Sequence, residues 1–99
     1  MSEREFLEVD PAALWLPGGR RDGADPVKLQ RQLTQYGQLT FGMPPLEVSR
    51  GSDGHLVIND GVTRATRMAK YLPGRKVRVE VISLIPAAVG GLPTVKDRL

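Results

Sequence analysis

"HLVINDGVTRATRMAKYL", residues 55–72, is the stretch that decides the fold. It begins with three consecutive apolar residues, Leu56-Val57-Ile58, which are typical of a buried strand. The chain then turns at Asn59-Asp60-Gly61. Beyond the glycine, apolar residues recur at the i, i+3, i+4, i+7 spacing of an amphipathic helix, at Ala65, Met68, Ala69 and Leu72. The stretch therefore predicts a strand that passes through one glycine directly into a helix.

The start of this helix is a candidate anion-binding site. The first N–H groups of a helix have no partner within it, and the helix dipole adds positive potential at the same end. Arg64 in the first turn and Arg67 one turn later would add planar, positively charged donors for a phosphate or carboxylate. Together with Tyr71 they share the helix face opposite the apolar stripe, so we expect both arginines to lie away from the core. The alternative is that Asp60 only caps the helix and that the arginines lie on a solvated surface.

Composition restricts the class of protein. The 99 residues are enough for one domain, without room for a second core. There is no cysteine, which excludes disulfides, thiolate metal sites and a cysteine nucleophile, and the single histidine cannot form a histidine-rich metal site, so we expect no metal centre. No apolar run approaches the roughly 20 residues of a membrane span. The N-terminus MSEREFLEVD lacks the apolar core of a signal peptide, which predicts a cytoplasmic protein without membrane contact. The net charge of +3 permits nucleotide or nucleic-acid binding without requiring it.

The rest of the chain adds three strands and one helix to this unit. Strands are expected at residues 5–10, 46–50 and 76–83, and Gly51-Ser52-Asp53-Gly54 is a hairpin turn that pairs the second of these with the Leu56 strand. A helix is expected from Pro26 to Tyr36, with Asp25 as its N-cap and Gly37 as its C-terminal cap. Trp15 is expected to anchor the core. The Pro/Gly-rich tail, residues 85–99, either lies along the domain or is disordered. This order predicts an α+β fold, a mixed sheet with flanking helices.

The order of elements and several short motifs resemble the N-terminal domain of ParB-like proteins, in the ParB/sulfiredoxin superfamily. The residues that carry the resemblance are 25–37, 44–48, 56–64 and 77–82. It extends from Phe6 to Ser83 and implies a single ParB-like domain over residues 1–84, followed by the C-terminal tail 85–99. The helix-turn-helix and dimerisation domains of chromosome-partitioning ParB proteins do not fit in this length, so site-specific DNA binding and partition-complex assembly are not expected of this chain alone.

The resemblance implies a nucleotide-binding site at the strand-Gly-helix junction. ParB-like proteins carry Gly-Glu-Arg-Arg there, in contact with the phosphates of CTP. Gly61 and Arg64 match the first and last positions, whereas Val62 and Thr63 replace the Glu and the first Arg. The implied ligand is CTP or ATP with Mg²⁺. Val62 stands where sulfiredoxin has its catalytic cysteine, which excludes sulfiredoxin chemistry. The two histidines of the superfamily's free-serine kinases are also missing, and no catalytic residue is assigned.

The predicted phosphate ligands are therefore Gly61, Val62, Thr63, Arg64 and Arg67, with Asp60, Gly37, Thr40, Arg20 and Arg21 as additional candidates. Two other functions remain open. The first is a nucleic-acid- or protein-binding module that kept the fold but lost catalysis, with DNA as a partner of the basic residues Arg64, Arg67, Lys70, Arg75, Lys76 and Arg78. The second is a metal-dependent NTPase, phosphotransferase or nuclease that would use Asp60, Asp53 or Glu47. The sequence leaves the oligomeric state undefined.

Overall fold

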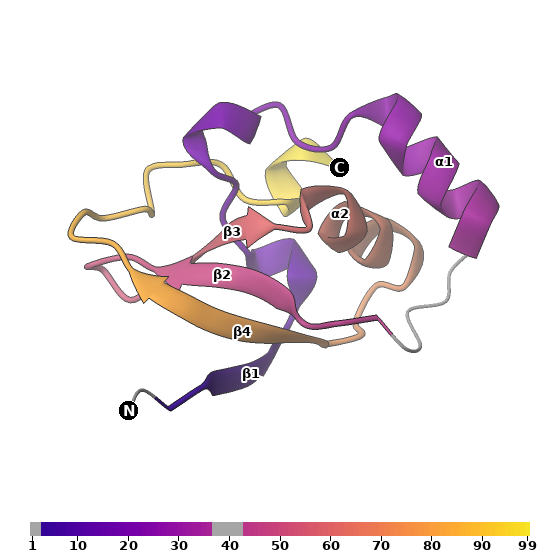
Figure 1. Cartoon of the computed structure of the whole chain (residues 1–99). Helices are drawn as coiled ribbons and strands as arrows, with labels where there is room; N and C mark the ends of the chain where they lie inside the picture. Colours follow the sequence, from indigo (N-terminus) through magenta and orange to yellow (C-terminus); the bar gives the residue numbers. More distant parts are fainter. Residues whose placement is uncertain (1–2, 37–42) are drawn as a thin grey trace.

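Strands and helices follow one another in the predicted order. The computed structural model describes residues 3–36 and 43–99. Its elements are β1 (Glu5–Val9), α1 (Pro26–Tyr36), β2 (Leu46–Arg50), β3 (Leu56–Asp60), α2 (Val62–Tyr71) and β4 (Val77–Leu84), with 3-10 turns at Pro11–Ala13, Gly18–Arg20 and Lys96–Arg98 (Figure 1). The expected bounds of α1 and of the hairpin strands are confirmed to within a residue or two.

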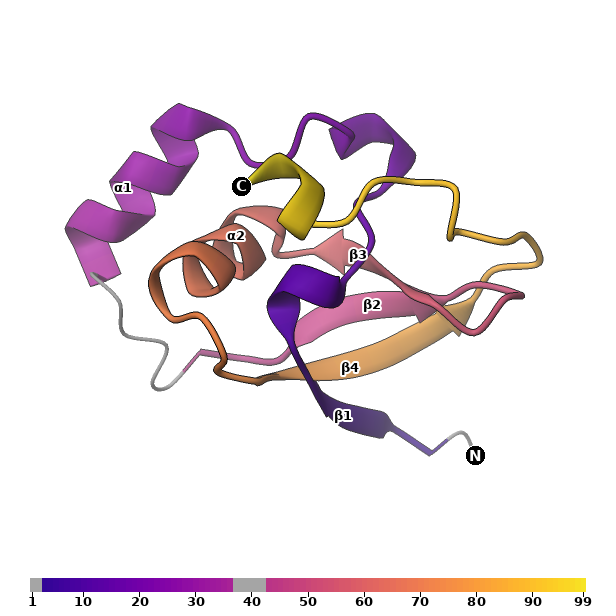
Figure 2. The same ribbon diagram turned by 180° about the vertical axis from the view of Figure 1, so that it is seen from behind.

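The four strands form one mixed sheet in the order β1-β4-β2-β3. β1 pairs antiparallel with β4, and β2 pairs antiparallel with β3. The two central strands, β2 and β4, run parallel. The connection between them passes through β3 and α2, which lies against the sheet with α1 beyond it (Figures 1 and 2). The predicted α+β class is confirmed.

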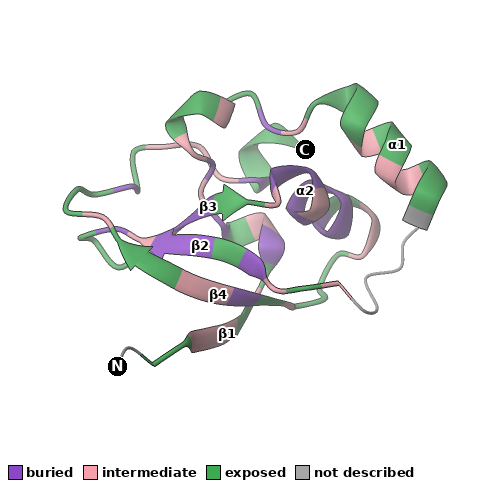
Figure 3. Ribbon diagram, viewed as in Figure 1, coloured by how far each residue is buried: buried purple, intermediate pink, exposed green. Residues whose placement is uncertain are grey.

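The core lies between α2 and the sheet, and the burial pattern of β4 follows the predicted alternation (Figure 3). In β4 the valines at alternate positions, 77, 79 and 81, face the core, as expected of a strand covered on one side. The buried core residues are Leu14, Leu16, Leu46, Val48, Ile58, Val62, Ala65, Ala69, Val79 and Val95.

Helix α1 begins as its sequence predicts. The Asp25 Oδ1 atom accepts a hydrogen bond from the N–H of Val27 at 2.8 Å, and Pro26 occupies the first helical position. Leu29 and Leu33 are half-buried on one face of the helix. The predicted cap Gly37 and the candidate ligand Thr40 lie outside the described residues.

Trp15 does not anchor the core, and that expectation is wrong. Residues 14–16 are extended alongside β3, where the Trp15 N–H donates to the Leu56 carbonyl and its carbonyl accepts from the Ile58 N–H, each at 2.9 Å. The alternation of an extended chain sends Leu14 and Leu16 into the core. Trp15 therefore faces the other way and stacks on His55, with ring centroids 4.1 Å apart.

The C-terminal segment, residues 85–99, lies along the domain. Val95 is 1% exposed, and its N–H donates to the Leu14 carbonyl at 2.9 Å. Val89 is 4% exposed. The Asp53 Oδ2 atom, in the β2–β3 turn, accepts from the N–H groups of Val89 at 3.1 Å and Gly90 at 2.8 Å. One carboxylate of the hairpin turn thus holds the chain that follows β4.

Burial raises the pKa of Asp53, but the hydrogen bonds from the N–H groups of Gly90, Val89 and His55 outweigh it and lower the pKa. Because the folded pKa lies below the unfolded value of about 3.9, ionised Asp53 stabilises the fold fully above that pH. This contribution is lost as the pH falls through the folded pKa. We expect Asp53→Ala to accelerate hydrogen exchange at the Val89 and Gly90 amides at neutral pH.

Asp22→Ala, which removes an exposed carboxylate outside this contact, is the matched control and should leave both exchange rates unchanged. In the unmodified protein, the chemical shift of the Gly90 amide should titrate below the ordinary aspartate pKa. Unchanged exchange in Asp53→Ala would show that other contacts hold the segment.

Candidate functional site

The turn between β3 and α2 consists of Gly61 alone. β3 extends to Asp60, and Gly61 is the N-cap of α2 with a φ of 108°, without a side-chain capping bond. The alternative that Asp60 caps the helix is therefore wrong. A side chain at Gly61 would be strained by this φ, and its Cβ would overlap the Cδ2 atom of Leu46, which is fully buried. The helix can start here only because this residue is a glycine.

Arg67 lies inside the protein, and the expectation that it faces away from the core is wrong. The residue is 1% exposed, and its Nη2 atom donates to the Met43 sulfur at 3.3 Å. Met43 precedes β2, so the segment before that strand contacts Arg67, and α1 also packs against α2 (Figure 1). The role of Arg67 as a phosphate ligand stays a prediction.

Val62 and Thr63 are also enclosed, at 5% and 7% exposed. Val62 belongs to the core cluster, and its carbonyl accepts a hydrogen bond from the Thr66 hydroxyl at 2.8 Å. Both residues lie in the first turn of α2, as predicted, but neither lines the hollow beside it. Their part in binding a phosphate stays a prediction.

Arg64 lines a hollow of about 260 Å³ between α2, the start of β4 and the segment that precedes β2. The lining residues are Met43, Pro44, Pro45, Arg64, Met68, Lys76, Val77 and Arg78. Three of them are cationic and, within the described part of the chain, no carboxylate joins them. The hollow, called here the Arg64 pocket, is therefore positively charged and has an apolar wall.

Arg64 is half-buried and forms no hydrogen bond or salt bridge with the residues that the structure describes. Burial, followed by the positive charge of Arg67, lowers the pKa of Arg64, while the Asp60 carboxylate opposes this shift. A Cβ on Gly61 would lie 3.8 Å from the Arg64 Nη2 atom, so the guanidinium reaches back to the turn. The arrangement exposes a partly desolvated cation beside a helix N-terminus, which favours an anion.

Lys76 and Arg78 were named in the sequence only as part of a basic surface, and their place in the lining of the same hollow as Arg64 was missed. They reach it because β4 follows α2 and runs beside β2. Arg78 alternates with the core-facing valines, so its guanidinium lies on the outer face of the sheet, over the Phe6 ring and 4.2 Å from the centroid. The sequence contains a pattern that predicts this position: Lys76 and Arg78 stand at the start of the strand expected to follow the helix.

The loop arginines lie elsewhere. Arg20 lines a separate hollow of about 610 Å³ with Asp22 and Asp25. The Arg21 carbonyl accepts a hydrogen bond from the Arg98 Nε atom at 2.6 Å. Neither arginine lines the Arg64 pocket. Across residues 3–36 and 43–99, no three acidic or histidine side chains gather as a metal site would require.

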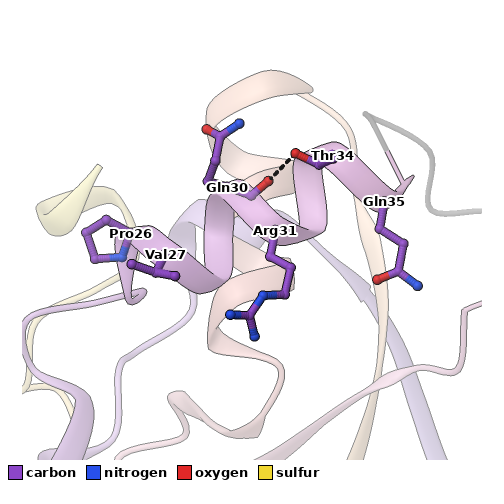
Figure 4. A pocket seen from close by; sticks show the side chains of 6 residues that line it. All are labelled: Pro26, Val27, Gln30, Arg31, Thr34 and Gln35. Carbon is purple, nitrogen blue, oxygen red and sulfur yellow. Dashed lines mark hydrogen bonds between the residues drawn. The ribbon is translucent and has the colours of Figure 1, made fainter.

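A further hollow of about 590 Å³ lies along α1, lined by Pro26, Val27, Gln30, Arg31, Thr34 and Gln35 (Figure 4). All six lining residues are exposed, and the Thr34 hydroxyl donates to the Gln30 carbonyl of the preceding turn at 3.0 Å. This is an open helix surface with a single charged side chain. It lacks a half-buried cation like Arg64 of the Arg64 pocket.

Comparison with known proteins gives a likeness of fold. No protein-family profile matches the chain, and no curated protein matches it. Among solved structures the chain is similar to a Pnob8-like ParB-N domain, with 23% identity and a TM-score of 0.45 over 82% of this chain and 31% of that chain. The chain thus spans about a third of that chain's length. The match is to the family that the sequence motifs resemble, and a likeness of this degree carries no argument about a site or a ligand. No helix in the described part is long and apolar enough to cross a membrane.

We expect Gly61→Ala to lower the free energy of unfolding by about 2–4 kcal/mol, the sum of a left-handed backbone and an overpacked contact with Leu46. Gly74→Ala is the matched control because Gly74 also has a positive φ, 85°, but open space around its Cβ position. It should lose only about 1 kcal/mol. Urea unfolding measures both, and equal losses would show that the contact with Leu46 is not limiting.

Proposed function

We propose that this chain binds a phosphate-bearing anion in the Arg64 pocket. One observation carries the proposal: the half-buried Arg64 lines, together with Lys76, a hollow that no described carboxylate shares. A cation that loses part of its hydration without gaining a hydrogen bond or salt bridge is unfavourable, and an anion bound there would compensate. The N-terminus of α2, beside Arg64, adds positive potential to the same region.

The proposed ligand is a nucleotide, CTP or ATP with Mg²⁺. The Gly61–Arg64 motif and its resemblance to ParB-like proteins support this choice. Met43, Pro44, Pro45 and Val77 give the pocket an apolar wall, which suits a ligand with an organic part as well as phosphates. Since drug-sized ligands occupy pockets of roughly 300–1,000 Å³, we expect part of the nucleotide to lie outside the pocket.

Binding of a nucleic-acid backbone is the second candidate. Lys70, Arg75, Lys76 and Arg78 are all exposed and lie on α2, the loop after it and the start of β4. A steep fall of affinity with salt, extending to duplexes of unrelated sequence, is its signature. A nucleotide held in the pocket would instead discriminate between ligands and depend on Arg64 more than on Arg75.

The test is an amide NMR titration of the labelled chain with CTP, ATP and GTP, with and without magnesium, and with pyrophosphate as the minimal probe. We expect shifts clustered at residues 61–68 and 76–78. Arg64→Ala should weaken binding at least about tenfold, the loss of one charge-assisted contact.

Arg75→Ala removes an exposed arginine outside the pocket and should change the affinity by less than about twofold, as exposed charges do. Neither variant replaces a residue of the core cluster, so each should remain folded. Unchanged affinity in Arg64→Ala would disprove the site, and binding of pyrophosphate without preference for any nucleotide would restrict the function to phosphate alone.

A further inference from the structure

A smaller hollow of about 180 Å³ lies where the chain after β1 meets the β2–β3 hairpin. Its lining residues are Val9, Asp10, Ala13, Leu14, Trp15, Gly54, His55 and Leu56. Trp15 and His55 stack with an angle of 21° between their ring planes. An apolar cavity of about 150 Å³ holds one benzene ring, so this hollow, called here the Trp15 pocket, has room for one side chain or a small ligand.

The aromatic wall is held in place by contacts that fix both residues. The backbone of Trp15 is bonded to β3 on both sides, through the Leu56 carbonyl and the Ile58 N–H. The N–H of His55 donates to the Asp53 Oδ1 atom at 3.3 Å, and the other oxygen of that carboxylate holds the chain at Gly90. The pocket therefore has a wall whose shape does not depend on a ligand.

The charge of the Trp15 pocket is opposite to that of the Arg64 pocket. Asp10 lines it, and no lysine or arginine does so within the described part of the chain. The Asp10 Oδ1 atom accepts from the Ala12 N–H at 3.0 Å, which leaves its other oxygen for a donor from outside. An exposed carboxylate beside a tryptophan and apolar side chains is the combination that receives an organic cation.

We propose that the Trp15 pocket binds an alkylammonium or guanidinium group, with its stem against Val9, Leu14 and Leu56 and its charge toward Asp10. The same chemistry is offered by a free small amine and by a lysine or arginine side chain of a peptide. Lysine and arginine bury an apolar stem while their charged end stays in contact with polar groups. The two pockets share no lining residue, so binding at the Trp15 pocket does not depend on binding at the Arg64 pocket.

The experiment is a titration of the full chain with n-butylammonium and with the neutral n-butanol, followed at the indole N–H of Trp15, which is the only tryptophan. We expect a saturating shift with butylammonium at millimolar concentration and a response at least about tenfold weaker with butanol. Blocked Gly-Lys-Gly and Gly-Arg-Gly peptides form the second arm. Stronger binding of a peptide than of butylammonium assigns the site to a partner's side chain, and the reverse assigns it to a free amine.

Asp10→Asn should weaken the response to butylammonium at least about tenfold, because it removes the charge but keeps an N-cap that asparagine supplies equally well. Asp25→Asn is the matched control: Asp25 also caps a helix through its Oδ1 atom, but it lies outside the pocket. An absent Trp15 response, an equal response to butanol, or an equal response in Asp10→Asn would overturn the proposal.

Discussion

The contact between Gly61 and Leu46 determines how the helix and the sheet meet. Gly61 turns the chain from β3 into α2 with a single residue at positive φ, and the Leu46 side chain fills the space that any other residue would need there. Leu46 is the first residue of β2, the strand beside β4. The same contact therefore sets where α2 begins and, through the paired strands, where Lys76 and Arg78 stand relative to Arg64.

What the sequence predicts well is local. Three features depend only on residues close to one another in the chain: the glycine between an apolar run and an amphipathic helix, the Asp25-Pro26 start of α1, and the hairpin turn. Each can therefore be recognised in one sequence. The alternation of valines in β4 likewise predicts which side of that strand is buried. From these elements the mixed sheet and the α+β class follow, since strands and helices in this order must cover one another's apolar faces.

What the sequence predicts badly depends on partners distant along the chain. Leu14, Trp15 and Leu16 form hydrogen bonds with β3 and with the C-terminal segment. Residues 14–16 and the C-terminal segment are held to each other by backbone hydrogen bonds. Backbone pairing does not require a periodic pattern of side chains, so neither segment shows one. Once the residues are extended, two leucines compete with one tryptophan for the core side, and the leucines occupy it. The large apolar surface of a tryptophan side chain does not by itself decide which residue enters the core.

The burial of Arg67 shows that a wrong prediction of a helix's buried face changes the expected charge distribution of a site. An arginine three residues from another, on the polar side of an amphipathic helix, predicts two solvated cations. Arg67 is enclosed instead, with its Nη2 atom donating to the Met43 sulfur, and its positive charge contributes to lowering the pKa of Arg64. Two like charges in a partly desolvated region repel each other more strongly than they would in water. The Asp60 carboxylate offsets only part of this repulsion, so that a burial the sequence does not reveal helps to keep the pKa of Arg64 lowered.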